Sequence, residues 1–506
     1  MSSQTTRGRD ADVVVVGAGP TGLLLAGDLA EAGLRVRLLE KRDRTSNLTR
    51  AFAVHARTLE QLDARGLADD LVATGTRVEG IRLFGGIELD VTDLPTRFPF
   101  VLITPQYHVE RLLGQRADTA GVELRRGAEV VSLEQDRTGV TVTHRGPDGS
   151  RQRTRASYVV GTDGFRSRVR QLLGLPFPGR SALRSLMLAD VRFSDPPTEV
   201  ITVSGNERGF AFIAPFGDGW FRVIARRAGG DPDDDVPVAL EEIREAVREV
   251  FGHDFGMGEA RWTSRFHSDE RQAPRYRVGR VLLAGDAAHV HSPAGGMGMN
   301  TGLQDAADLG WRLALAVRHD GTPVADELVD GYEAERHPVG RMVLRLSGGL
   351  LRAALLRHPV ARAVRNTVVP VVLRSPVGRR GRELVSGIGI RYPAPPGEHP
   401  LVGTRAPDVT GGDGTRLAEA LRGVRFVLVT PDAAWASRYD DRLAVLVRSG
   451  QQGSVLVRPD GYVAWVGAAG ADLDPVLGRW GLGGAYDVEP ARSSAVRTSA
   501  ASSLAT

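Results

Sequence analysis

The chain has 506 residues, enough for two or three domains, with 42% hydrophobic residues, 25% charged residues and a formal net charge of +4. It contains no cysteine, which excludes disulfides, thiolate catalysis and cysteine-based metal sites. No apolar run reaches the ~18 residues of a membrane span, and no basic and aromatic module indicates nucleic-acid binding. We therefore expect a cytoplasmic protein that binds neither membranes nor nucleic acids.

After a polar N-terminal tail, the first predicted element is a buried strand over residues 12–16. A glycine-rich turn at 17–22 and an apolar helix over 23–31 follow, and a second strand covers 36–40. A strand, a glycine turn, a helix and a strand in this order predict the βαβ start of a nucleotide-binding fold.

The turn carries the pattern Gly-x-Gly-x-x-Gly at Gly17, Gly19 and Gly22. In such a turn the first glycine permits a tight bend, the second lets the backbone approach a pyrophosphate, and the third lets the helix pack closely on the strand. Glu40 ends the next strand, where a carboxylate can accept both hydroxyls of an adenosine ribose. Since Glu40 disfavours a 2′-phosphate, the pattern predicts bound FAD or NAD.

Residues 176–275 differ in character, with short alternating strands and one amphipathic helix over 240–251. They predict a separate mixed layer inserted into the nucleotide-binding fold. A long helical stretch then runs to about residue 375, and we expect it to be broken at Pro338, Pro359 and Pro370. A linker at 393–397 precedes a compact unit with alternating helices and strands.

Two further motifs place an aspartate directly after a strand, at Asp163 and Asp286. These carboxylates can reach ribose or ribityl hydroxyls. The second motif continues into a proline- and glycine-rich loop that opens a helix over 303–316. Backbone N–H groups at such a helix start can bind a flavin ring and stabilise negative charge on it.

The order and spacing of the three motifs resemble those of the group A flavoprotein monooxygenases, the para-hydroxybenzoate hydroxylase-like family. The resemblance spans about residues 11–375. It is strongest to the aromatic polyketide hydroxylases and rifampicin monooxygenase-like enzymes, through the segments 39–41, 54–60 and 109–113. Met297 departs from the pattern, because many relatives carry glutamine there.

The resemblance implies an α/β fold with a Rossmann-like FAD-binding domain, an inserted mixed-sheet substrate domain and a C-terminal thioredoxin-like domain. The implied ranges are 11–175 and 276–375 for the FAD-binding domain, 176–275 for the substrate domain, 398–490 for the C-terminal domain, and 1–10 and 493–506 for flexible tails. Without cysteine the last domain cannot perform thiol chemistry, so we expect it to be structural or to contribute to a homodimer.

The resemblance also assigns roles to individual residues along the cofactor. Glu40 and Lys41 belong to the adenosine end, and Asp286 to the ribityl or pyrophosphate part. The complete set of expected cofactor-binding residues is Gly17, Gly19, Thr21, Gly22, Glu40, Lys41, Arg50, Gln106, Val130, Asp163, Asp286, Pro293, Gly298, Met299 and Asn300.

The implied reaction is reduction of FAD by NADPH or NADH, capture of O2 as a flavin C4a-hydroperoxide, and oxygen transfer to an aromatic substrate. Antibiotic inactivation, Baeyer–Villiger oxygenation, epoxidation and a reductase without oxygen transfer remain open alternatives. No catalytic side chain can be named from the sequence. Substrate-lining candidates on the inserted layer are Met187, Phe210, Phe212, Pro215 and Phe221.

His289 and His291, which follow the third motif, invite a metal hypothesis. They lie two residues apart, without a nearby carboxylate or cysteine set in the sequence. This is a weak metal pattern, so we expect no metal site.

Overall fold

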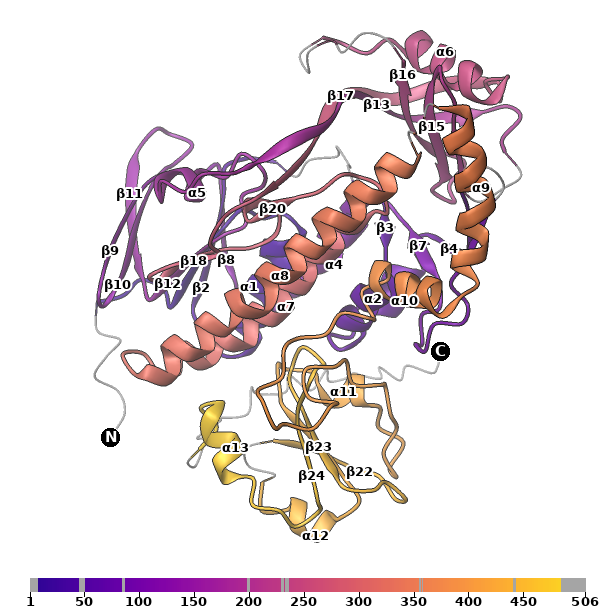
Figure 1. Cartoon of the computed structure of the whole chain (residues 1–506). Helices are drawn as coiled ribbons and strands as arrows, with labels where there is room; N and C mark the ends of the chain where they lie inside the picture. The colour runs from indigo at the N-terminus through magenta and orange to yellow at the C-terminus, as the bar shows by residue number, and fades with distance from the viewer. Residues whose placement is uncertain are drawn as a thin grey trace, which may run out of the picture.

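The computed structural model describes residues 8–44, 51–83, 87–197, 201–228, 232, 236–354, 356, 358–439 and 443–483. Arg50, residues 1–7 of the first tail and the whole of the second lie outside the described residues. Figure 1 shows a layer of long helices against strands, an antiparallel sheet at one end of these helices, and a C-terminal unit below them.

A six-stranded sheet has the order β18-β19-β12-β1-β2-β8, and its neighbours are parallel except for the edge pair β18–β19. The four valines of the central strand β1 are all buried, as expected for a strand covered on both faces. The Rossmann-like prediction is confirmed. The strands are β1 (Val13–Val16), β2 (Val36–Glu40), β8 (Glu123–Arg126), β12 (Tyr158–Gly161), β18 (Arg277–Val278) and β19 (Val281–Leu283).

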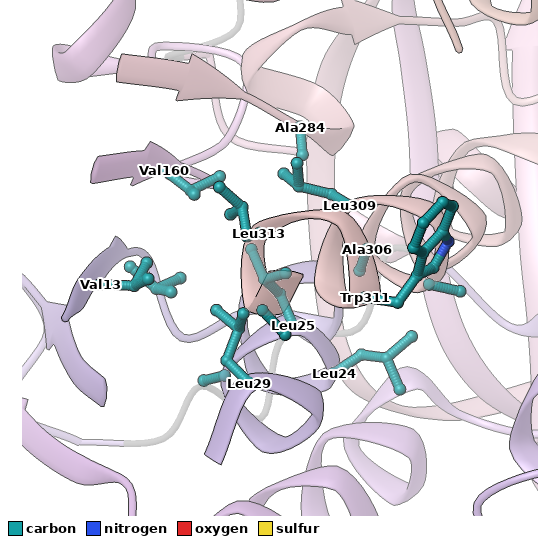
Figure 2. Packing of buried hydrophobic residues seen from close by; sticks show 14 of the residues in the cluster. Val13, Leu24, Leu25, Leu29, Val160, Ala284, Ala306, Leu309, Trp311 and Leu313 are labelled. Atoms are coloured by element: carbon teal, nitrogen blue, oxygen red, sulfur yellow. The ribbon is translucent and has the colours of Figure 1, made fainter. Parts of the chain in front are cut away.

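Two buried helices, α1 (Pro20–Glu31) and α7 (Met297–Arg318), pack on this sheet and on each other. Figure 2 shows leucines of both helices, among them Leu25 and Leu313, closing over Val13 and Val160. Smaller elements complete this half: α2 (Ala56–Asp63), α3 (Ala68–Val72), α4 (Gln106–Thr119), α5 (Arg168–Leu172), η2 (Gly285–Ala287), the sheet of β3 (Ala53–Val54), β7 (Val101–Ile103) and β4 (Thr76–Val78), and the sheet of β11 (Arg151–Ala156), β10 (Gly139–Arg145) and β9 (Glu129–Asp136).

An eight-stranded sheet of order β20-β17-β13-β16-β15-β14-β5-β6 forms the second layer, with α6 (Leu240–Phe251) on one face. It is antiparallel except where β14 meets β5. It is wider than the predicted range 176–275, because β5, β6 and β20 join it from outside that range. The strands are β5 (Gly80–Leu83), β6 (Ile87–Asp90), β13 (Gly179–Phe193), β14 (Thr202–Gly205), β15 (Gly209–Pro215), β16 (Phe221–Arg227), β17 (Met257–Gln272) and β20 (His289–Val290).

Helix α8 (Pro323–Ala354) runs beside α7 and continues through Pro338, while α9 (Pro359–Leu373) continues through Pro370. The expected breaks at these two prolines were wrong. A proline removes one helical hydrogen bond, but in α8 the packing against α7 holds the helix, and in α9 only the last turn is affected. The break at Pro359 is confirmed, because α9 begins there. Helix α10 (Pro376–Val385) follows.

The C-terminal unit is a four-stranded sheet, β22-β21-β23-β24, in which only β21 and β22 are parallel. Part of its core is continuous with the core of the six-stranded sheet and its helices. Phe426 and Trp480 pack edge-on against Trp311 of α7, with ring centroids 5.4 and 5.5 Å from that of Trp311. The elements are α11 (Leu417–Ala420), β21 (Val427–Thr430), α12 (Ala433–Ala436), β22 (Ala444–Val447), β23 (Ser454–Val457), β24 (Val463–Gly467) and α13 (Asp474–Arg479).

Among the helices that the structure describes, none combines the length and the apolar character needed to cross a bilayer.

Candidate functional site

A cavity of about 1470 Å³ lies where the six-stranded sheet, the eight-stranded sheet and the start of α7 meet. All three sequence motifs open into it. Twelve of the expected cofactor-binding residues line it: Gly17, Gly19, Thr21, Glu40, Lys41, Gln106, Val130, Asp163, Asp286, Pro293, Gly298 and Met299.

The three glycines of the first motif differ in their surroundings. Gly17 has a φ of +105°, and a Cβ there would lie 2.6 Å from the Thr162 carbonyl oxygen. A Cβ at Gly22 would lie 1.9 Å from the Gly17 carbonyl oxygen. At Gly19 a Cβ would meet nothing within 4 Å, so the space above this residue is open. Gly17 and Gly22 thus permit the turn and the packing, while Gly19 leaves room for a pyrophosphate at the start of α1.

Glu40 is buried in the cavity wall beside the glycine turn. Its carboxylate accepts a hydrogen bond of 2.8 Å from the Ala18 N–H and two of 3.0 Å from the backbone and side chain of Arg42. Burial alone would raise the pKa of Glu40, but these hydrogen bonds hold it below its ordinary value. An ionised carboxylate held here is a suitable acceptor for ribose hydroxyls.

Asp163 lines the same cavity. Its Oδ2 atom accepts from the N–H groups of Arg168 and Val169 at 2.6 and 3.1 Å. Its Oδ1 atom is buried and has no hydrogen-bond partner among the described residues. Burial raises the pKa of Asp163 above its ordinary value. A buried oxygen of this kind fits a ligand hydroxyl, as FAD would supply.

Gln106 connects two parts of the cavity wall. Its Oε1 atom accepts from the Ala51 N–H at 3.2 Å, and its Nε2 atom donates to Glu110 at 2.7 Å. Burial raises the pKa of Glu110, a cavity residue that we did not predict.

Two expected residues are close to the cavity without lining it. Gly22 lies behind the turn. The amide of Asn300 is turned inward, where it donates to the carbonyl oxygens of Ala53 at 2.9 Å and Gly296 at 2.8 Å and accepts from the His55 N–H at 2.9 Å. Asn300 therefore ties the start of α7 to the start of α2.

The apolar wall of the cavity comes from the eight-stranded sheet. Leu188 and Ile224 pair across β13 and β16, and both line the cavity together with Phe52 and Phe266. Met187 is one position from Leu188, so its side chain lies on the opposite face, in the core under α6. Phe221 packs in that same core.

The other three substrate candidates also lie outside the cavity lining. Phe212 is nearest to it, because its ring packs against Phe52 at 5.3 Å. Phe210 lies two positions along β15, on the same face of the strand as Phe212. Pro215 pairs with Phe221 at the far end of β15.

Comparison with known protein families agrees with this geometry. The family described as FAD binding domain matches residues 10–347, and the family described as aromatic-ring hydroxylase, C-terminal, matches residues 399–483. The chain belongs to the FAD-binding aromatic-ring hydroxylases. It is an FAD-dependent aromatic monooxygenase.

Three of the similar proteins come from Streptomyces. A 12-dehydrotetracycline 5-monooxygenase/anhydrotetracycline 6-monooxygenase of Streptomyces rimosus subsp. rimosus is 40% identical over 500 residues, covering 92% of this hydroxylase and 96% of the relative. A rifampicin monooxygenase of Streptomyces venezuelae is 39% identical over 479 residues, covering 93% and 98%. The solved OxyS anhydrotetracycline hydroxylase of Streptomyces rimosus superimposes with a TM-score of 0.82 at 38% identity, covering 93% and 99%.

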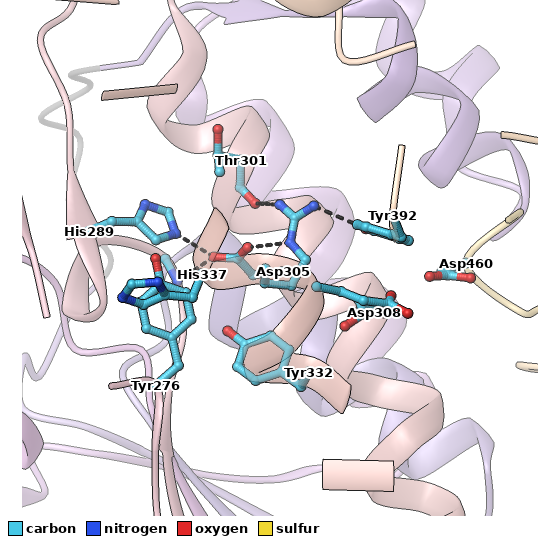
Figure 3. Close-up of polar contacts among 12 residues, drawn as sticks. Tyr276, His289, Thr301, Asp305, Asp308, Tyr332, His337, Tyr392 and Asp460 are labelled. Atoms are coloured by element: carbon cyan, nitrogen blue, oxygen red, sulfur yellow. Dashed lines mark hydrogen bonds and ion pairs between the residues drawn. The ribbon is translucent and has the colours of Figure 1, made fainter. Parts of the chain in front are cut away.

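We call residues 293–296, in the proline- and glycine-rich loop between β20 and α7, the flavin loop. The hydroxylase also has a buried chain of polar contacts around Asp305 of α7 (Figure 3). Asp305 accepts from His289 Nε2 at 2.6 Å and from Arg336 Nε at 2.7 Å. Burial would raise the pKa of Asp305, but His289 and Arg336 lower it to about 2. Arg336 also donates to the Tyr392 hydroxyl at 3.0 Å, which continues the chain toward the C-terminal unit.

A second buried cluster joins the hydroxylase's domains. Asp308, Glu335 and Asp460 bring three carboxylate oxygens within 4.8 Å of one another. Arg312 and Arg458 occupy this cluster, with Arg458 2.8 Å from Glu335 and 2.5 Å from Asp460. The two guanidinium groups compensate two of the three carboxylates, and burial raises the pKa of the third, Asp308, well above its ordinary value. Ion pairing therefore accounts for the cluster.

The sequence alone indicates neither cluster and does not identify the apolar wall. The members of each cluster are separated by up to about 150 positions, and single buried charges carry no local signal. The alternation of side chains along β13 would have predicted Leu188 as a substrate-lining residue as readily as Met187. The sequence does not say which face of the strand borders the cavity.

His55 gives the hydroxylase a measurable acid sensitivity. It is buried beside the flavin loop, and burial lowers its pKa from 6.5 to about 4. The unfolded chain takes up a proton at pH 6.5 and the folded chain only near pH 4, so stability is present above pH 6.5 and is lost as the pH falls toward 4. We expect this group to cost roughly 2 kcal/mol of unfolding free energy between pH 7 and pH 5.

Urea unfolding at saturating FAD, compared at pH 7 and pH 5, measures this loss, and His55→Leu should lose less than the wild type over this interval. As a matched control, His253→Leu alters a histidine of the second layer and should retain the wild-type dependence. Equal pH dependence in the wild type and His55→Leu contradicts the assignment.

Proposed function

We propose that this hydroxylase inserts one oxygen atom from O2 into a polycyclic aromatic polyketide-type phenol, with NADPH or NADH as reductant. The observation that supports the proposal most is the two-part cavity, with polar cofactor-binding motifs at one end and the apolar pair Leu188 and Ile224 at the other. The relatives that act on tetracycline intermediates indicate the size and class of the substrate.

In the proposed reaction the residues of this chain bind the cofactor and the substrate, orient them toward each other and exclude water. FAD would supply the oxygen-activating redox chemistry, held by the Gly19 turn, Glu40 and the start of α7. The apolar wall of the eight-stranded sheet would hold the aromatic rings against the flavin loop and keep water out. The nicotinamide is proposed to dock transiently, because the described residues offer one dinucleotide cradle.

Oxidative inactivation of an antibiotic is the second candidate. The 39% identity to a rifampicin monooxygenase supports it. We further infer that the C-terminal unit is thioredoxin-like and structural, since its sheet mixes one parallel and two antiparallel pairs and the chain has no cysteine.

The decisive experiment incubates FAD-loaded protein with NADPH or NADH, O2 and either anhydrotetracycline or rifampicin. The molecular masses of the products are then measured by mass spectrometry. A gain of one oxygen in anhydrotetracycline supports biosynthetic hydroxylation, and a gain only in rifampicin supports the second candidate. Production of hydrogen peroxide alone with every aromatic compound contradicts both.

The apolar wall gives a mutational test of the substrate side. Leu188→Trp places an indole in the cavity and is expected to lower kcat/KM for the polycyclic substrate by about 100-fold, equivalent to roughly 3 kcal/mol, while FAD remains bound. The matched control is Met187→Leu, a volume-conserving change one residue away under α6, which should alter kcat/KM less than about threefold. Similar losses in both variants would contradict the assignment of this face.

A further inference from the structure

His291 links the cavity to the buried polar chain behind it. It follows β20 and lines the cavity, whereas its neighbour His289 is fully buried. His291 Nε2 lies 2.9 Å from His289 Nδ1, and His289 Nε2 lies 2.6 Å from Asp305 Oδ2. The three side chains thus form a continuous series from the cavity wall to a buried carboxylate.

The hydrogen-bond donors in this series can be assigned from its inner end. Asp305 is an ionised acceptor, because it also accepts from Arg336 Nε and from the Gly285 N–H at 3.1 Å. His289 therefore donates from Nε2, and in its neutral form its Nδ1 accepts from His291 Nε2. This leaves His291 Nδ1 unprotonated.

That nitrogen is the one unused atom of the series. His291 Nδ1 is buried and has no hydrogen-bond partner among the described residues. This acceptor in a cavity-lining residue therefore lacks a donor, and the hydroxyl of a bound substrate would supply one. A Cβ built at Gly298 would lie 4.0 Å from His291 Cδ2, so the ring stands beside the first turn of α7, near the flavin loop.

We propose that His291 is the base that accepts the phenolic proton of the substrate, with His289 and Asp305 as its relay. This rests on the proposed function, because it requires a phenolic substrate in this cavity. The O–H bond of the phenol breaks, its electron pair stays on oxygen, and an N–H bond forms at His291 Nδ1. The Nε2 proton of His291 passes to His289 Nδ1, and the positive charge comes to rest beside Asp305. The resulting phenolate ring is more electron-rich than the neutral phenol, which favours oxygen transfer to it.

The surrounding charges are consistent with this role. Burial and the neighbouring His289 hold the pKa of His291 well below its ordinary value, so the ring is neutral and free to accept. Alone it would be a weak base, but the relay moves the charge toward Asp305. The titratable or charged groups near the series include Tyr276, whose ring packs against His289 and His337, and Arg336 on Asp305. Arg271 pairs with Val290 in the adjoining strand, and His267 and Asp286 line the same cavity.

The test uses FAD-loaded protein and 1,2-dihydroxyanthraquinone, a polycyclic phenol whose phenolate has a distinct visible spectrum. In the wild type we expect the bound phenol to ionise at a pH at least about one unit below that of the free phenol, a tenfold change in its ionisation equilibrium. His291→Gln, whose amide can still reach His289, should abolish this shift with little change in affinity. The matched control is His253→Gln, a histidine of the second layer that packs on Phe255 outside the cavity lining, and it should retain the shift.

Each outcome is informative. If the bound phenol ionises as in solution, the proton relay is overturned while the hydroxylase assignment stands. If the wild type does not bind the phenol, the proposed substrate class fails and this inference fails with it. If His291→Gln loses FAD, the titration is repeated with His291→Asn. Loss of FAD from both variants would show that the His291 ring has a structural role, and it would overturn the proposal.

Discussion

Gly19→Val is expected to produce a folded protein that no longer retains FAD. The backbone at Gly19 has a φ of −79°, which any residue adopts, and a Cβ there meets no atom of the chain within 4 Å. The added methyl groups would instead occupy the space at the start of α1 where a pyrophosphate must approach the backbone. We expect FAD affinity to fall by at least about 100-fold, or roughly 3 kcal/mol.

Titration of the apoprotein with FAD, followed by flavin fluorescence, measures the loss, and far-UV circular dichroism checks the fold. Gly114→Val in α4 is the matched control, because a Cβ at Gly114 also meets nothing within 4 Å and the residue lies away from the cavity. Gly22→Val should behave differently from both, since its Cβ would collide with the Gly17 carbonyl and impair folding itself. Unchanged FAD affinity in Gly19→Val would contradict the assigned cradle.

Arg458→Leu is expected to be the most destabilising single substitution at the junction between the domains. Its side chain is 3% exposed, and removing it leaves Asp460 and Asp308 buried without this counter-charge. Breaking a buried ion network by removing one partner typically costs about 3–5 kcal/mol. The expected result is a large fall in the urea midpoint of the FAD-loaded protein.

A matched surface pair provides the control. Arg479 contacts Glu398 at 2.9 Å, but its side chain is 53% exposed, so Arg479→Leu should cost no more than about 1 kcal/mol. The two substitutions remove the same charge from the same unit. If Arg458→Leu shifts the midpoint as little as Arg479→Leu, the network contributes little to stability.

The nucleotide-binding half of the fold was predictable because its signals are local. The apolar strands, the glycine turn and the position of Glu40 follow one another within thirty residues, and each has a direct physical role. The three motifs meet in one cavity because the carboxyl ends of parallel strands lie at the same edge of a sheet.

The substrate wall and the junction were not predictable for the opposite reason. Choosing Leu188 over Met187 requires knowing that α6 covers the other face of β13. Asn300 was expected among the cofactor-binding residues, but the sequence could not show that its amide bonds to Ala53, nearly 250 positions away. The continuation of α8 through Pro338 depends on its packing against α7, a tertiary contact that outweighs the local preference of proline.

The shared core around Trp311 has a practical consequence for cutting the chain. The segment 393–397 is coil and turn, and all five of its residues are exposed, which leaves it open to a protease. Yet Phe426 and Trp480 on one side of that segment are packed against Trp311 on the other. A single nick there would therefore yield two fragments that migrate separately in denaturing gels but elute together, still yellow with flavin, from a sizing column.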